Sequence, residues 1–146
     1  MNSYGIENAS PVLGAIVNSI VFSKSFDSLT EELEKLNVSE RKVCIITDST
    51  VAKLYADPIM RLLDGKCKKN ILHIFPAGEA NKTLDTVKAA YKVLIDEKFD
   101  RNDLLVALGG GVTGDVTGFI AATYLRGVDF VQIPTTLLAQ ADSSIG

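Results

Sequence analysis

From residue 42 onward, short runs of β-branched and apolar residues alternate with helical patterns along the chain. This alternation is typical of βαβ units built around a parallel sheet. Three of the expected strands contain nearly continuous apolar runs, VCII, LLVAL and FVQI, as strands covered by helices on both faces do. The sequence therefore predicts an α/β fold, a parallel sheet flanked by helices, with strands at 43–47, 70–75, 103–108 and 128–133.

Helices are expected between these strands from the spacing of apolar residues. Ser28 and Glu31 have capping-box spacing at the start of the first helix, and Pro58 should kink or divide the second. The fourth should run from about 113 to 125, and residues 15–22 could form an additional strand. The apolar faces of the first three helices consist of Leu29, Leu33 and Leu36; of Val51, Leu54, Ile59 and Leu62; and of Leu84, Val87, Tyr91 and Leu94.

Length and composition fit one domain over residues 1–146, with 47% hydrophobic and 23% charged residues. Acidic and basic residues are interspersed and the net charge is -3, so the chain lacks the basic stripe that nucleic acid or an anionic membrane would require. No apolar run approaches the roughly 20 residues of a membrane span, and the start MNSYGIENAS does not resemble a secretion signal. We therefore expect a cytoplasmic protein without nucleic-acid or membrane partners.

A glycine-rich turn is the strongest chemical signal. In DLLVALGGGVTGDVTGF a strand enters the turn and a helix follows, and Gly109, Gly111 and Gly114 have the G-x-G-x-x-G spacing. Glycines let the backbone approach a pyrophosphate, and the free N–H groups at the helix start face the anion. The acidic residue usually found about 20 positions later would be Asp129, which begins the next strand instead of ending it. A nucleotide would therefore be bound atypically. The alternative is a turn needed only for close helix packing, to which Gly114 and Gly118 would contribute.

Three further loops follow strand ends at the same edge, where ligands collect in parallel α/β sheets. In the first, Asp48 could accept a hydrogen bond from a ribose or simply cap a helix. In the second, Glu79 could accept from sugar hydroxyls and Lys82 could meet phosphate oxygens, or both could serve only loop structure. In the third, Thr135 and Thr136 open another helix, where threonines are common caps.

The single histidine and the two cysteines do not have the spacing of a metal site. His73 in ILHIF should point across a sheet face as a hydrogen-bonded structural histidine. Cys44 in VCII and Cys67 in GKCKKN form neither a metal-type pair nor a disulfide framework, so both are expected to be reduced structural thiols. Any ligands of a metal must come from elsewhere.

The segments PAGEANKTLDTV and LVALGGGVTGDVTGFIAATYLRGVDFVQIPTTLLAQADSSIG closely resemble the N-terminal half of the 3-dehydroquinate synthase family. The resemblance covers most of residues 42–146 with several motifs in the family's order, while residues 1–41 resemble it weakly. It implies a Rossmann-like NAD-binding domain. The family's helical C-terminal domain, which supplies the ligands of Zn²⁺ or Co²⁺ and most substrate-binding side chains, is expected to be absent from this chain.

The resemblance also implies an activity, the conversion of the sugar phosphate 3-deoxy-D-arabino-heptulosonate 7-phosphate to 3-dehydroquinate and phosphate in the shikimate pathway. In that lyase reaction NAD removes and returns a hydride, and the metal polarises the hydroxyl and carbonyl as a Lewis acid. The 146-residue chain alone is expected to bind NAD weakly and to be inactive, because the other half of the site would be missing.

The resemblance assigns roles to individual residues. Asp142 would face the substrate and the metal, and Arg126 would reach the substrate phosphate of the partner subunit, which implies a homodimer. No metal ligand is expected in this chain. The implied cofactor contacts are Asp48 near the adenine ribose; Gly78, Glu79, Asn81 and Lys82 at the ribose and phosphates; Gly110, Gly111, Val112, Thr113, Gly114 and Asp115 in the pyrophosphate turn; and Thr135 and Thr136 beside the nicotinamide.

Two alternatives remain open. One is a related enzyme, such as a cyclase that makes 2-deoxy-scyllo-inosose or valiolone. Iron-dependent and glycerol-type dehydrogenases of the same fold usually show GGGS, and the motif GGGVTGD argues against them. The second alternative is a nucleotide-binding module without catalysis.

Overall fold

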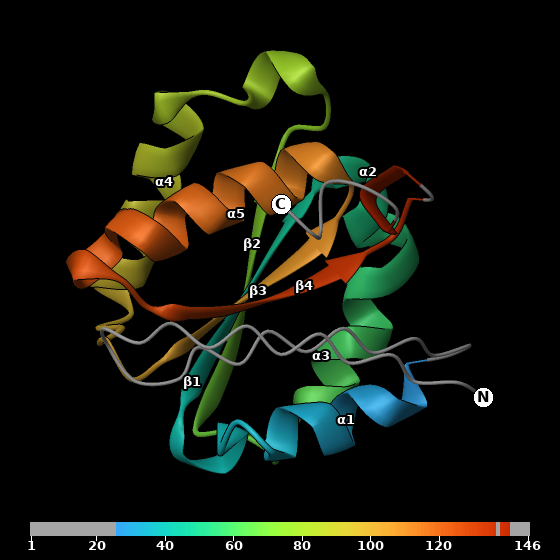
Figure 1. Cartoon of the computed structure of the whole chain (residues 1–146), viewed down its shortest axis with the longest axis vertical. Coiled ribbons are helices and arrows are strands. Elements are labelled where there is room, and N and C mark those ends of the chain that lie inside the picture. Colours follow the sequence, from blue (N-terminus) through green and yellow to red (C-terminus); the bar gives the residue numbers. More distant parts are fainter. Residues whose placement is uncertain (1–25, 137, 141–146) are drawn as a thin grey trace, which may run out of the picture.

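The computed structural model describes residues 26–136 and 138–140. They form a four-stranded parallel sheet of order β2-β1-β3-β4, with α4 and α5 on one face and α1 and α3 on the other (Figure 1). This confirms the predicted α/β fold. The strands are β1 (Lys42–Asp48), β2 (Lys69–Phe75), β3 (Leu104–Gly109) and β4 (Asp129–Pro134). The helical segments are α1 (Asp27–Glu34), η1 (Val38–Glu40), α2 (Ser49–Val51), η2 (Ala52–Ala56), α3 (Asp57–Leu63), η3 (Glu79–Asn81), α4 (Leu84–Asp96), α5 (Gly111–Thr123) and η4 (Tyr124–Arg126).

The predicted strands agree with the observed ones to within one residue at each end, and the possible strand at 15–22 lies outside the described residues. The predicted capping box is wrong. Helix α1 begins at Asp27, and its N-cap Phe26 makes no side-chain cap hydrogen bond. Ser28 therefore lies inside the first turn, where its hydroxyl is no longer at the cap position.

The core has two layers, one on each face of the sheet. Alternate side chains of a strand point to opposite faces, so Cys44 and Ile46 of β1 pack under α4 and α5. Val43 and Ile45 pack against α1 and α3. Burial raises the pKa of the Cys44 thiol to about 12, so the thiol is protonated at neutral pH. Every residue of β3 is buried, which explains its continuous apolar sequence.

Pro58 was expected to kink or divide the second helix. The structure shows a change from π-helical to α-helical hydrogen bonding just before this proline. Residues 49–63 are helical without a break, but η2 is a π turn that ends where α3 begins. A π turn contains one residue more than an α turn, so it shifts the phase of the apolar stripe. Ile59 is fully buried as predicted, whereas Leu54 is 62% exposed, contrary to the prediction. Leu84, which was expected on the apolar face of α4, is also exposed.

The four strands run in the same direction, so their carboxyl ends lie at one edge of the sheet. The register aligns these ends, pairing Asp48 with Phe75 and Gly109 with Pro134. From β1 the chain passes to β2 on one side, and β3 lies on the other side of β1. In open parallel sheets, ligands bind beside such a switch in strand order, outside the carboxyl ends.

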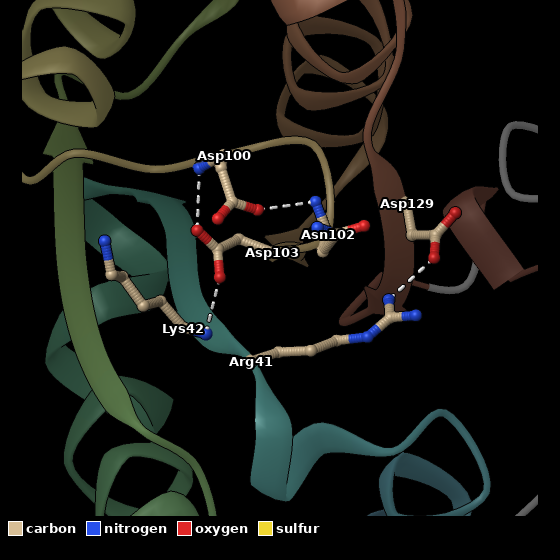
Figure 2. Close-up of polar contacts among 6 residues, drawn as sticks. All are labelled: Arg41, Lys42, Asp100, Asn102, Asp103 and Asp129. Carbon is tan, nitrogen blue, oxygen red and sulfur yellow. Dashed lines mark hydrogen bonds and ion pairs between the residues drawn. The ribbon is translucent and has the colours of Figure 1, made fainter.

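At the opposite edge of the sheet, where the strands begin, contacts of Asp103 and Asp129 connect separate segments of the chain (Figure 2). Asp103 is 5% exposed, and its carboxylate accepts hydrogen bonds from the backbone N–H groups of Lys42 and Asp100, both at 2.8 Å. Nη1 of Arg41 lies 2.6 Å from Oδ2 of Asp129 and links the start of β1 to the start of β4. Asp129 thus lies at the amino edge, away from the strand ends where a ribose would be bound.

Candidate functional site

The glycine turn is as tight as its sequence predicts. Strand β3 ends at Gly109 and helix α5 begins at Gly111. A Cβ on Gly109 would lie 2.5 Å from Oγ1 of Thr113, so only glycine fits there. The N–H of Gly114 donates to the carbonyl of Gly110 at 3.0 Å as α5 begins. The amides before Gly114 have no carbonyl of a preceding turn to bond and are available at the carboxyl edge.

The same helix approaches β4 closely. A Cβ on Gly114 would lie 3.1 Å from Oε1 of Gln132, which is tighter than normal packing. A Cβ on Gly118 would meet the ring of Phe130 at 3.6 Å, an ordinary van der Waals distance. A Cβ would therefore crowd its neighbour at Gly114 and not at Gly118, so close packing of α5 on β4 involves Gly114, and the turn also presents free amides.

Asp48 ends β1 and caps the helix that follows. Its Oδ1 accepts hydrogen bonds from the N–H groups of Thr50 at 2.8 Å and Val51 at 3.0 Å, which confirms the capping interpretation. Its Oδ2 is 3.4 Å from Oγ1 of Thr113, which is almost fully buried on α5. The carboxylate therefore lies between the ends of β1 and β3, beside the glycine turn.

The loop after β2, residues 76–83, is fixed by its own polar groups. Gly78 has φ +110, a conformation that L side chains rarely adopt. Nδ2 of Asn81 donates to the carbonyl of Ala77 at 3.0 Å, and the N–H of Ala77 donates to Oγ of Ser49 at 3.1 Å. The Asn81 amide thus holds the loop in shape, and Ser49 ties the loop to the end of β1.

Lys82 connects this loop to the glycine turn. Its Nζ lies 2.6 Å from Oδ2 of Asp115 and 3.9 Å from Oε1 of Glu79. The hydrogen bond to Asp115 raises the pKa of Lys82 above its usual value, so the ammonium is charged at neutral pH. Sequence reasoning missed this ion pair, although Lys82 follows β2 and Asp115 follows β3, two strands that end at the same edge of the sheet.

The residues after β4 also lie against the turn. The N–H of Thr135 donates to the carbonyl of Gly109 at 2.9 Å. Oγ1 of Thr136 accepts from the N–H of Ala139 at 3.1 Å, so it has the predicted capping role. A Cβ on Gly110 would lie 3.2 Å from Cγ2 of Thr136. The loops after β1, β2, β3 and β4 therefore converge at one edge, as expected.

Two of the expected site residues are not part of this group. Asp142 lies outside the described residues. Arg126 ends η4, just before β4 begins, and is therefore at the amino edge of the sheet with its side chain exposed. Among the described residues, the expected cofactor contacts lie at the carboxyl edge, away from Arg126.

His73 was predicted to be a hydrogen-bonded structural histidine, and the structure differs from that prediction at one ring nitrogen. Its Nε2 is buried and has no hydrogen-bond partner among residues 26–136 and 138–140. Burial lowers the pKa of His73, which favours the neutral imidazole. Within the described part of the chain no cluster of three histidine, cysteine, aspartate or glutamate side chains could hold a metal ion, and no helix is long and apolar enough to cross a bilayer.

Two grooves follow helix α5 on either side. One of about 230 Å³ lies between α4 and α5 and extends from Lys82 and Asp115 to Phe119. The other, of about 280 Å³, lies between α5 and the start of β4. Neither groove includes residues 109–114. The glycine turn therefore lines neither of these two grooves.

Comparison with known proteins identifies the family. The family model described as 3-dehydroquinate synthase N-terminal matches residues 72–146. A 3-dehydroquinate synthase of Vesicomyosocius okutanii is 50% identical over 118 residues, 81% of this chain and 32% of that protein. One of Ruminiclostridium cellulolyticum is 49% identical over 119 residues, 80% of this chain and 33% of that protein. The chain thus spans about a third of the length of these relatives.

Solved structures of related enzymes share the fold. A 2-deoxy-scyllo-inosose synthase complexed with carbaglucose-6-phosphate, NAD⁺ and Co²⁺ superposes with a TM-score of 0.73 at 31% identity, over 81% of this chain and 32% of that one. A 2-epi-5-epi-valiolone synthase from Streptomyces hygroscopicus with NAD⁺ and Zn²⁺ bound gives 0.70 at 28% identity, over 88% of this chain and 38% of that one. Because the family model matches more than half of its residues, the chain belongs to the 3-dehydroquinate synthase N-terminal family.

Proposed function

We propose that this chain is the NAD-binding part of a 3-dehydroquinate synthase and that the cofactor's diphosphate lies against the amides at the start of α5. The observation that carries the proposal is the passage from β3 into α5, where Gly109 has no room for a Cβ and the first amides of the helix face the sheet edge. The NAD⁺ present in both related cyclase structures supports it.

The residues around the turn fit the two ends of a dinucleotide. The ammonium of Lys82 would contact phosphate oxygens, the Glu79 carboxylate would accept from ribose hydroxyls, and Oδ2 of Asp48 would face the adenine ribose. Thr135 and Thr136 would lie beside the nicotinamide. The proposed cofactor contacts are Asp48, Gly78, Glu79, Asn81, Lys82, Gly110, Gly111, Val112, Thr113, Gly114, Asp115, Thr135 and Thr136.

The reaction we propose is the conversion of 3-deoxy-D-arabino-heptulosonate 7-phosphate to 3-dehydroquinate and phosphate, in the cytoplasm and in the shikimate pathway. Bound NAD supplies a reversible hydride acceptor, and the part of this chain is to bind and orient it. The described residues contain no group of three histidine, cysteine, aspartate or glutamate side chains that could hold a metal ion. We propose that zinc or cobalt is bound by residues outside them, with Asp142 facing the metal and the substrate.

The position of Arg126 supports the proposal that the enzyme is a homodimer. It is exposed at the amino edge of the sheet, whereas the cofactor residues lie at the carboxyl edge. A side chain in that position suits the role proposed for it, a contact with the substrate phosphate bound by a partner subunit.

A related sugar-phosphate cyclase is the second candidate. The 2-deoxy-scyllo-inosose and 2-epi-5-epi-valiolone synthases share the fold at 31% and 28% identity. The roughly 50% identity to 3-dehydroquinate synthases favours the first candidate. Assaying the complete enzyme with each sugar phosphate in turn, and following phosphate release, separates the two.

Calorimetric titration of the purified chain with NAD tests the cofactor site. We expect binding heat at millimolar NAD, and Lys82→Ala should weaken binding about tenfold because it removes a charge-assisted contact to phosphate. Lys88→Ala is the matched control, since Lys88 is exposed on α4 and pairs with Asp85. No heat from the unmodified chain, or an equal loss in both variants, would contradict the proposal. The chain alone should release no phosphate from the heptulosonate substrate.

A further inference from the structure

The turn that carries Arg126 has a strained backbone. Leu125 and Arg126 have φ values of 50 and 69, and Gly127 follows with φ 119. Only glycine adopts positive φ without a steric penalty, and two adjacent residues with side chains in this region are unusual. Such a conformation persists only where the surrounding structure holds it. The turn therefore needs an anchor.

The side chains of the turn do not provide that anchor. Leu125 is 48% exposed and Arg126 is also exposed. Two backbone hydrogen bonds close the turn, from the N–H of Gly127 to the carbonyl of Tyr124 at 2.9 Å and from the N–H of Val128 to the carbonyl of Ala121 at 2.8 Å. Both depend on where the end of α5 and the start of η4 are held.

Tyr124 is the buried residue at this point. Its hydroxyl donates to the backbone carbonyl of Phe99 at 3.0 Å, in a buried hydrogen bond to the loop before β3. Its ring stacks on that of Tyr91 from α4, with centroids 6.0 Å apart. Burial and the nearby Asp103 and Asp100 raise the pKa of Tyr124, so its hydroxyl remains protonated and keeps donating. Tyr124, which directly precedes Leu125 and Arg126, is thus held both by the stacking of its ring and by the hydrogen bond of its hydroxyl.

We propose that Tyr124 is a positioning residue, which holds the strained turn through its bond to Phe99 and so directs the Arg126 guanidinium toward a substrate phosphate. The inference rests on the proposed function, in which Arg126 contacts the sugar phosphate bound by the partner subunit. Tyr124 itself contacts no substrate in this scheme, because its hydroxyl is used within the domain. It acts only through Arg126.

A double-mutant cycle in the complete homodimeric enzyme tests the inference. Tyr124→Phe keeps the ring and removes the hydroxyl, and should raise KM for the sugar phosphate about fivefold, the effect of one lost hydrogen bond, with little change in kcat. Arg126→Ala should raise KM more. In the Arg126→Ala background, Tyr124→Phe should have no further effect on KM. The Kd of NAD should remain unchanged in all variants, because the cofactor residues lie at the other edge of the sheet.

A matched control is Tyr55→Phe, since Tyr55 packs edge-on against Phe26 near the other face of the sheet; this variant should leave KM unaltered. An equal rise in KM from Tyr124→Phe in both backgrounds would show a general structural role and overturn the inference. If Arg126→Ala raises KM and Tyr124→Phe does not, the inference alone fails. If Arg126→Ala leaves KM unchanged, the proposed role of Arg126 fails, and the positioning role of Tyr124 fails with it.

Discussion

Nζ of Lys82 lies 2.6 Å from Oδ2 of Asp115, so one ion pair joins the loop after β2 to the first turns of α5. The two segments are those proposed to hold the ribose and the diphosphate of the cofactor. Both side chains are partly exposed, so water and salt screen the pair and its effect on stability should be small. Its consequence is local, since it determines where the ammonium of Lys82 points.

Asp115→Asn should lower the pKa of Lys82. The hydrogen bond and the charge of Asp115 are the main causes of the raised value, so removing the charge shifts it back toward the ordinary lysine value. Titration of the lysine side chains by NMR measures the change. Asp85→Asn is the control, because that carboxylate pairs with Lys88, and a similar shift of Lys82 in both variants would argue against the pair.

Gly109→Ala should destabilise the domain by about 1–3 kcal/mol, the usual cost of forcing extra atoms into a packed site. The new Cβ would lie 2.5 Å from Oγ1 and 2.7 Å from Cβ of Thr113, and the Cβ contact cannot be relieved by rotating the threonine side chain. Urea denaturation measures the change. Gly118→Ala is the matched control, because its Cβ meets Phe130 at 3.6 Å and alanine favours the helix by up to about 1 kcal/mol. Equal destabilisation by both changes would contradict the clearance argument.

Asp103→Ala should cost about 2–4 kcal/mol of folding free energy, because the buried carboxylate accepts two partly buried hydrogen bonds, from the N–H groups of Lys42 and Asp100, and both would be lost. Thermal or urea unfolding measures it. Asp129→Ala removes a carboxylate that is 66% exposed and paired with Arg41, and should change stability by less than about 1 kcal/mol. The prediction fails if the two variants unfold alike.

Below about pH 6.5, His73 should make the domain less stable. Burial lowers its pKa in the folded state relative to the reference of 6.5, so the unfolded chain binds the proton more tightly. The contribution of neutral His73 to the free energy of unfolding is therefore fully present above pH 6.5, and it is lost as the pH falls toward the pKa of the folded state. His73→Leu should reduce the difference in urea midpoint between about pH 7.5 and about pH 5.5, two values on either side of the reference pKa of 6.5. An unchanged difference would show that other groups cause it.

Much of the fold could be predicted because β1 and β3 are buried on both faces, which leaves a continuous apolar signal in the sequence. The positions of Gly109, Asp48 and Thr136 at one edge followed from strand direction alone. The capping box at Ser28 failed because helix starts are set by local backbone geometry that spacing does not fix. The exposure of Leu54 followed from the π turn, which periodicity cannot reveal.

Contacts between separate loops could not be obtained from the sequence in the same way. The hydrogen bond between Ser49 and Ala77 and the ion pair of Lys82 depend on how far apart the loops lie. The strain at Arg126 is a property of backbone angles that its residue type does not indicate. These features determine the details of the site, whereas the sequence pattern determines which edge carries it.

Helix α5 has 13 residues and, at a rise of 1.5 Å per residue, is about 20 Å long. The glycine turn lies at one end and Arg126 just beyond the other. The proposed diphosphate contacts and Arg126 are thus separated by about the length of this helix, which fits the proposal that they serve different reaction centres. In a dimeric synthase, the start of each α5 would bind the cofactor of its own subunit. Arg126, after the end of the same helix, would contact the substrate phosphate in the active site of the neighbouring subunit.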